Sequence, residues 1–171
     1  MMAKLIVEGK EFDIEILDPE LVKIISPAKK KTGYERVEEG SVTYLGYIHP
    51  EGTTANTIDD RSFGCDYAYD IADYYSDETV ARNNARADKL MRRLRRFAVE
   101  HRKEKLDWND TAQDKYYIEF DHEEVKFNVD SFACFQEFGT VFFDSDNTAW
   151  LAIDVFRDEL MWYFTEYKDS L

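Results

Sequence analysis

The feature that most constrains the fold of this 171-residue chain is an internal repeat. Segments 41–59 and 114–132 each predict two strands joined by a short turn, because β-favouring and polar side chains alternate in both. Sliding the sequence by 68 residues places YYSDETVA (74–81) on FFDSDNTA (142–149), which aligns an aromatic pair, a polar helix cap and an alanine. The pattern predicts two ββα-like units. Because the match is short, chance similarity stays an alternative.

The first 31 residues have a pattern of their own. Apolar residues at 5–7 and alternating apolar and acidic residues at 12–16 predict a β-hairpin with its turn at 8–10. ELVKII (20–25) predicts a short helix that ends before Pro27. We therefore expect an α+β protein with antiparallel sheets packed on helices. Its expected parts are an N-terminal β-hairpin and short helix (1–31), a first ββα-like unit with a long basic helix (32–106), and a second with a C-terminal aromatic helix (107–171).

Each repeat ends in an amphipathic segment typical of a long helix. The first helix should begin near Ser76, whose hydroxyl can accept a hydrogen bond from an N–H group of the first turn. The second should begin within 144–147. In both segments apolar residues recur at three- and four-residue spacing, which predicts one buried face on each helix. Trp150 and Trp162 lie off the centre of the second stripe.

The chain is strongly acidic, with a net charge of -14, but the charge is unevenly distributed. Residues 82–105 carry 10 Lys/Arg against 3 Asp/Glu, whereas the segments before and after them are acidic. An acidic protein is repelled by nucleic acid and by anionic lipid, so only the basic helix suggests contact with phosphates. We favour the alternative that its side chains pair with the protein's own acidic strands or with those of a second subunit. The basic side chains are Arg82, Arg86, Lys89, Arg92, Arg93, Arg95 and Arg96.

Composition indicates a folded protein without a membrane span. A hydrophobic fraction of 44% and an aromatic fraction of 15% exclude a disordered chain. No apolar run reaches the ~18 residues that cross a bilayer, and the N-terminus lacks the apolar stretch of a signal peptide, so we expect a cytoplasmic protein. Cys65 and Cys134 lack the spacing of metal ligands, and we interpret both as small core residues.

No catalytic motif is recognisable. The sequence has no glycine-rich phosphate loop, no zinc-binding pair and no nucleophile elbow, and its three histidines, His49, His101 and His122, belong to different elements. Aspartates grouped in sequence could hold Mg²⁺, but a chain with 36 Asp/Glu has such groups by chance. We therefore expect a non-enzymatic protein with no cofactor and no metal, and a metal-dependent hydrolase is the least favoured alternative. The groups are Asp59 and Asp60; Asp66, Asp70 and Asp73; and Asp107, Asp110 and Asp114.

Two kinds of side chain are candidates for contact with a partner. Carboxylates on a rigid face can imitate the phosphates of DNA, which present one charge per roughly 1.7 Å, although ordinary solvation explains any single cluster as well. Tyr and Trp anchor protein interfaces because they are large and stiff and can hydrogen-bond. The candidate acidic interaction face is Glu35, Glu38, Glu39, Asp59, Asp60, Asp121, Glu123 and Glu124. The aromatic interface candidates are Trp108, Trp150 and Trp162.

Four blocks of sequence carry a resemblance. They are KLIVEGKEFDIEI (4–16), KKKTGYERVEEG (29–40), DWND with KYYIEFD (107–121), and DELMWYFTEY (158–167). Together they resemble a group of small acidic proteins encoded by phages and prophages of Firmicutes, a family without an established activity. The resemblance implies a bacterial cytoplasm. By analogy, small acidic phage proteins often bind and block host machinery such as restriction enzymes and RNA-guided nucleases, sometimes as DNA mimics.

We hypothesise a phage- or prophage-encoded acidic binding protein that inhibits a host nucleic-acid-handling defence system, of the anti-CRISPR or anti-restriction type. Its partner would be a host or phage protein with a basic nucleic-acid-binding surface. The alternative is a nucleic-acid-associated accessory factor in phage replication or recombination that binds through helix 82–96. Nucleic acid is the less favoured partner, no membrane is expected, and a homodimer stays open.

Overall fold

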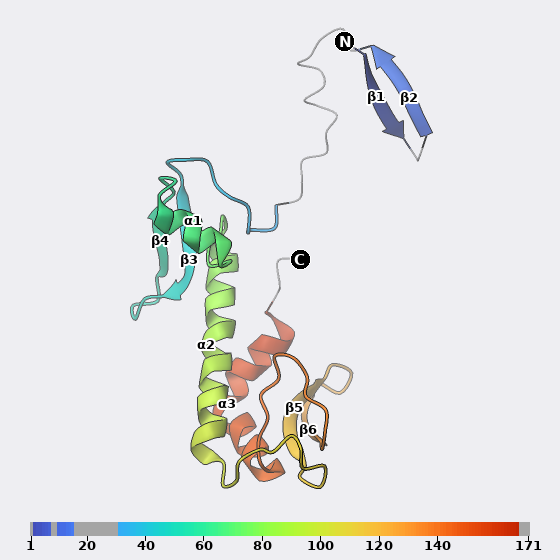
Figure 1. The fold of residues 1–171 in the computed structure, drawn as a ribbon. Coiled ribbons are helices and arrows are strands. Elements are labelled where there is room, and N and C mark those ends of the chain that lie inside the picture. The colour runs from blue at the N-terminus through green and yellow to red at the C-terminus, as the bar shows by residue number, and fades with distance from the viewer. Residues whose placement is uncertain (1, 8–9, 16–30, 168–171) are drawn as a thin grey trace. The chain divides into compact units, whose positions relative to one another are not determined.

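The computed structural model describes residues 2–7, 10–15 and 31–167. The chain divides into two compact units, Met1–Lys31 and Thr32–Leu171. In the first unit, β1 (Met2–Val7) and β2 (Lys10–Glu15) pair antiparallel, so the predicted N-terminal hairpin is confirmed (Figure 1). The core of its predicted turn and the short helix predicted at 20–25 lie outside the described residues.

The second unit contains two antiparallel hairpins and three helices, which confirms the α+β class. The first hairpin pairs β3 (Val42–Ile48) with β4 (Thr54–Ile58), and the second pairs β5 (Lys115–Asp121) with β6 (Lys126–Phe132). The helices are α1 (Phe63–Asp70), α2 (Glu78–His101) and α3 (Asp146–Thr165). Each strand falls within one residue of its predicted segment, whereas the short helix α1 was not predicted.

Each hairpin is tied by an isolated β-bridge to the segment that leads into a long helix. Tyr44 of β3 exchanges backbone hydrogen bonds with Tyr75, both 2.9 Å long. Tyr116 of β5 does the same with Phe143, at 3.0 and 2.8 Å. Tyr75 and Phe143 are 68 positions apart, so the three-dimensional arrangement follows the spacing of the sequence repeat.

The two long helices begin at equivalent positions of the repeat. The N-cap of α2 is Asp77, whose side chain accepts hydrogen bonds from two N–H groups of the first turn at 2.8 and 3.0 Å. The prediction of Ser76 was wrong by one residue, because its hydroxyl donates to Glu35 instead (3.0 Å). The N-cap of α3 is Ser145, within the predicted range, and it accepts from the N–H of Thr148 (3.2 Å).

Helix α2 joins the two repeats within the second unit. It packs on the first hairpin and on α3, and α3 in turn packs on the second hairpin (Figure 1). Helices α2 and α3 run antiparallel, since Phe97 meets Phe156 near one end and Arg86 meets Trp162 near the other. The core between α2, α3 and the second hairpin consists of Leu90, Leu94, Phe97, Ala98, Phe127, Phe143, Ala149, Ala152, Ile153, Phe156 and Leu160.

Candidate functional site

A buried carboxylate organises the region formed by β3, β4 and α1. Asp59 has no exposed surface, and its oxygens accept hydrogen bonds from Arg36 Nε (3.1 Å), Arg61 Nη1 (3.0 Å) and the Tyr74 hydroxyl (2.8 Å). The bond from Arg36 holds the pKa of Asp59 well below its usual range, and the same bond raises the pKa of Arg36. Asp59 is therefore a structural ion, and its place in the predicted acidic interaction face was wrong.

The groups around Asp59 fix three segments against one another. Arg36 Nη2 also binds Asp66 of α1 at 2.6 Å, and its guanidinium lies 5.3 Å from the ring centre of Tyr69. The Tyr74 hydroxyl accepts a hydrogen bond from the N–H of Val37 (3.1 Å). The chain before β3, the end of β4 and helix α1 are thus held together by bonds that converge on one carboxylate.

Glu35 is also committed to the fold. Its carboxylate accepts hydrogen bonds from the N–H groups of Thr32 (2.5 Å) and Gly33 (3.0 Å) and from the Ser76 hydroxyl. These bonds, that from Thr32 above all, lower the pKa of Glu35 to about 2. Of the acidic candidates in this region, the exposed ones are Glu38, Glu39 and Asp60.

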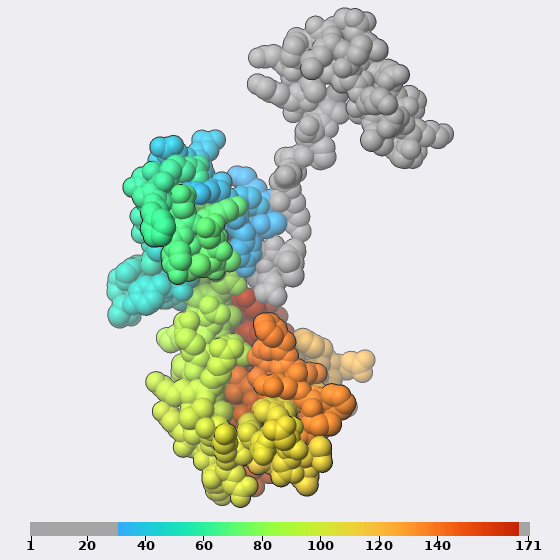
Figure 2. Space-filling model, in the orientation of Figure 1, coloured from blue at the N-terminus to red at the C-terminus, as the bar shows by residue number. Residues whose placement is uncertain are grey.

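Helix α1 presents an apolar stripe to solvent. Phe63 and Tyr67 lie one turn apart, their rings stack with centroids 6.3 Å apart, and they keep 85% and 56% of their surface exposed. Ile71, one further turn along, is 53% exposed. Figure 2 shows the residues of α1, coloured green, at the surface of the molecule. Sequence reasoning missed this stripe, although its four-residue spacing was a signal that could have revealed it.

Carboxylates flank the stripe. Asp66 and Asp70 follow Phe63 and Tyr67 by three residues, which places them on the adjacent row of the helix, and both are exposed. Residues 34–75 carry nine Asp/Glu against two Lys/Arg; both arginines are bound to Asp59, and Arg36 also pairs with Asp66. The surrounding surface is therefore strongly negative. We call this surface the α1 face and define it by Phe63, Tyr67, Ile71, Asp60, Asp66 and Asp70.

The other predicted acidic residues belong to a different hairpin. Asp121, at the end of β5, accepts hydrogen bonds from the N–H groups of Glu124 and Glu123, which lower its pKa. Glu124 is paired with Lys126, and Glu123 is exposed. The first and second hairpins lie apart (Figure 1). The structure therefore does not bring the eight predicted acidic residues into one face.

The basic side chains of α2 fall into three groups. Arg82 and Arg96 pair with carboxylates one turn away on α2 itself, at 2.6 and 3.8 Å. Arg93 pairs with a glutamate of α3, and the guanidinium of Arg86 lies 3.7 Å from the ring centre of an α3 tryptophan. Three of the seven thus bind the protein's own carboxylates. In the described part of the chain, no ion pair involves Lys89, Arg92 or Arg95.

The three tryptophans differ in exposure. Trp162 keeps only 7% of its surface exposed beneath Arg86, so its selection as an interface candidate was wrong. Trp108 is half-buried, with its ring against Phe142 at 4.9 Å. Trp150 is 43% exposed on α3. Of these candidates, Trp150 is the most exposed.

The described residues contain no arrangement of three or more His, Cys, Asp or Glu that could hold a metal ion. His49, His101 and His122 each lie against an aromatic ring, in three separate elements. Cys65 is buried but Cys134 is exposed, so the interpretation of both as core residues was wrong for Cys134. No helix of the described part is long and apolar enough to cross a membrane.

No family model matches the chain, and no curated protein or solved structure shows significant similarity to it.

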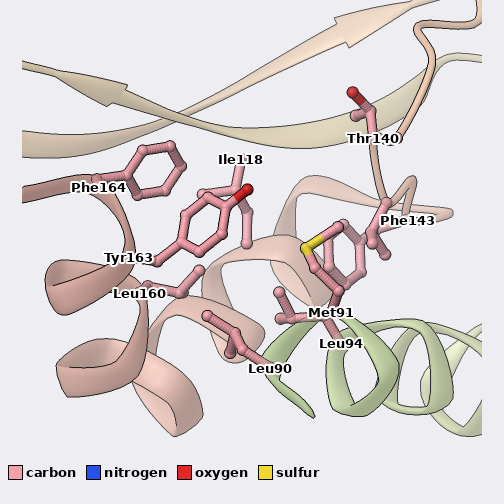
Figure 3. Close-up of a pocket in the computed structure, with 11 residues that line it drawn as sticks. Leu90, Met91, Leu94, Ile118, Thr140, Phe143, Leu160, Tyr163 and Phe164 are labelled. Atoms are coloured by element: carbon pink, nitrogen blue, oxygen red, sulfur yellow. The ribbon is translucent and has the colours of Figure 1, made fainter. Parts of the chain in front are cut away.

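One cavity, of about 200 Å³, lies between α2, α3, β5 and the segment 139–143 (Figure 3). Its lining is mostly apolar and includes Met91, Ile118 and Phe164, with polar oxygens from Thr140 and Tyr163. No charged side chain is among the residues that line it. Tyr163 is the single titratable side chain among the lining residues, and one phenol does not make an acid–base pair or an ion site, so we assign this cavity to the core.

Proposed function

We propose that this chain is a non-enzymatic binding protein that docks its α1 face on a basic surface of a protein partner. The observation that carries the proposal is the stacked pair of Phe63 and Tyr67, which is exposed and flanked by carboxylates. Large planar side chains supply most of the burial energy of an interface, and charges of one sign select a partner of the opposite sign.

The contacts that hold α1 in place favour the use of the α1 face as a docking surface. Hydrogen bonds and ion pairs from Arg36 fix α1 to the buried Asp59. A surface that is ordered before binding loses less conformational entropy when the complex forms. The α1 face can therefore bind tightly with few anchoring side chains.

A basic protein surface in a bacterial cell commonly serves to bind nucleic acid. A protein that covers such a surface with carboxylates competes with the nucleic acid. The resemblance to phage-encoded proteins leads us to propose that the partner is a host or phage nucleic-acid-handling protein, and that this chain inhibits a defence system of the anti-CRISPR or anti-restriction type. Imitation of DNA would concern only the exposed carboxylates, because Asp59 and Glu35 are committed to the fold.

The test is affinity capture with the full chain, followed by purification of the captured protein and measurement of its Kd and its DNA-binding or nuclease activity. We expect a basic partner whose activity the chain inhibits. Phe63→Ala with Tyr67→Ala should weaken binding by about 30-fold or more, since a hot-spot residue contributes about 2 kcal/mol.

The matched control is Phe135→Ala with Phe138→Ala, which removes two exposed aromatic side chains outside the α1 face. The control should leave Kd within about twofold of the original value. An unchanged Kd for the Phe63 and Tyr67 variant, or a partner whose activity the chain does not affect, would refute the proposal.

The alternative, a nucleic-acid-associated accessory factor that binds through residues 82–96, has narrower support. Pairing within the protein engages Arg82, Arg93 and Arg96, so the whole helix does not present its cations to a duplex. Of the remaining cations, Arg86, Lys89 and Arg92 line a groove, which leads to a separate inference.

A further inference from the structure

A groove of about 640 Å³ lies between the tip of the first hairpin and the helices α2 and α3. Its volume is within the roughly 300–1,000 Å³ that small-molecule sites occupy. We call it the tip groove. The lining residues that matter for its chemistry are Tyr47, His49, Arg86, Lys89, Arg92 and Trp162.

The tip groove is positively charged although the chain is acidic. Arg86, Lys89 and Arg92 follow one another at three-residue spacing on α2 and are exposed. Within the described part of the chain none of them has an ion pair. The single carboxylate among the lining residues, Glu159, is already bound by Arg93. An anion that enters the tip groove therefore meets three cations whose charge is not neutralised.

The net charge of -14 does not cancel this local attraction. At physiological ionic strength the Debye length is about 8 Å, so charges farther away are largely screened. The acidic residues of the α1 face and of the β5–β6 turn are not among the lining residues. Arg86, Lys89 and Arg92 are therefore the charged lining residues that have no ion pair in the described part of the chain, whereas the carboxylates of Asp73 and Glu51 lie beside the hairpin side of the groove.

Flat aromatic and cationic groups line the same groove. Tyr47 is 54% exposed at the hairpin tip, and the ring of His49 stands edge-on to it at 5.2 Å. The guanidinium of Arg86 lies flat enough on Trp162 to approach its ring centre to 3.7 Å, which orients this side chain. Exposed aromatic rings beside arginines are the groups on which nucleic-acid bases stack.

We propose that the tip groove binds a nucleotide unit, with its phosphate between Arg86, Lys89 and Arg92 and its base against Tyr47 and His49. The unit can belong to a single strand of nucleic acid or to a soluble nucleotide, since both offer the same phosphate and base. An acidic peptide would satisfy the cations but would not use the aromatic side chains. The inference uses no residue of the α1 face, so it stands or fails independently of the proposed function.

The experiment is fluorescence anisotropy of the full chain with a labelled oligothymidylate of roughly 12 nucleotides at about 50 mM salt, with ATP and a polyglutamate peptide as competitors. Lys89→Glu with Arg92→Glu should weaken oligonucleotide binding by about tenfold or more. Tyr47→Ala should weaken it by about fivefold or more, since a stacked base contributes about 1–3 kcal/mol.

The matched control is Arg95→Glu with Arg102→Glu, which makes the same change in net charge at exposed positions outside the tip groove. Thermal unfolding followed by circular dichroism verifies that all variants are folded. A smaller loss in the control than in the Lys89 and Arg92 variant supports the proposal. Competition by ATP assigns the groove to soluble nucleotides, and binding of the oligonucleotide without such competition assigns it to a strand.

Three results would overturn the inference. They are the absence of binding to both oligonucleotide and ATP, an equal loss of affinity in the control pair, and stronger binding of polyglutamate that Tyr47→Ala leaves unchanged.

Discussion

At the scale of single residues, Asp59 shows how a charge is kept inside this fold. A buried carboxylate loses its hydration, and the cost is offset only when opposite charges and hydrogen-bond donors replace the water. Arg36, Arg61 and Tyr74 supply these donors from three separate segments. Removal of one donor therefore weakens the contacts among all three segments.

The prediction at this scale concerns Tyr74, which is 1% exposed. Tyr74→Phe keeps the ring but removes the hydroxyl that donates to Asp59 and accepts from Val37, so we expect the free energy of unfolding to fall by about 1–3 kcal/mol. Urea denaturation measures this change. Tyr67→Phe, at an exposed position, is the control and should stay within about 0.5 kcal/mol of the original protein. Equal effects of the two substitutions would contradict the role given to Asp59.

At the scale of elements, the two long helices begin in the same way 68 residues apart. An aromatic residue bridged to a hairpin precedes each N-cap by two positions. The bridge places the start of the helix beside the first strand of its hairpin, and the cap satisfies an N–H group of the first turn. Between the two repeats, the backbone arrangement at the junction of hairpin and helix is therefore more similar than the side chains are.

We expect Asp77→Ala and Ser145→Ala each to lower the free energy of unfolding by about 0.5–2 kcal/mol, because each removes the acceptor of the first-turn N–H group. Chemical denaturation of the two variants measures the loss. Thr79→Ala, in the exposed first turn of α2, is the control for a change in helix propensity alone. A loss for Asp77→Ala no larger than that for Thr79→Ala would contradict the role of Asp77 as the N-cap of α2.

The elements predicted from sequence are those defined by local patterns. Apolar and polar side chains alternate within β3 to β6, and apolar side chains form a stripe along α2. Both patterns arise because residues close in sequence share a buried face, so the presence of these strands and of this helix can be predicted from the sequence. Helix α1 has Cys65 as its buried residue, and its apolar stripe faces solvent, so a search for a core-facing pattern misses it.

The candidate site was less predictable because its bonds join distant positions. Nothing local separates the buried Asp59 from its exposed neighbour Asp60, since the difference arises from Arg36 and Tyr74 elsewhere in the chain. For the same reason, the sequence did not show that Trp162 lies under Arg86. The tip groove likewise needs the hairpin to lie beside α2, which no local pattern contains.

At the scale of the whole molecule, the packing of residues 32–167 depends on α2. This helix contacts the first hairpin on one side and α3 on another, so each repeat uses it as part of its packing. Neither hairpin forms a sheet of more than two strands, and such a pair is marginally stable on its own. We infer that the two repeats unfold together.

Ile153→Ala tests this coupling, because the fully buried Ile153 belongs to the second repeat and its truncation should cost about 2–5 kcal/mol. Native-state hydrogen exchange should show the same loss of protection at the bridged amides of Tyr44 and Tyr116, one in each repeat. Val155→Ala, at an exposed position of α3, is the control and should change neither amide. Loss of protection at Tyr116 alone would mean that the repeats unfold independently.

The antiparallel packing of α2 against α3 has a consequence for synthesis on the ribosome. The apolar side of α2 around Leu94 and Phe97 is covered by α3, which ends at Thr165. At about 5–20 residues per second, several seconds pass between the synthesis of His101 and that of Thr165. During this interval the apolar face of α2 in the nascent chain is not yet covered, so the core between α2 and α3 closes only after α3 has been synthesised.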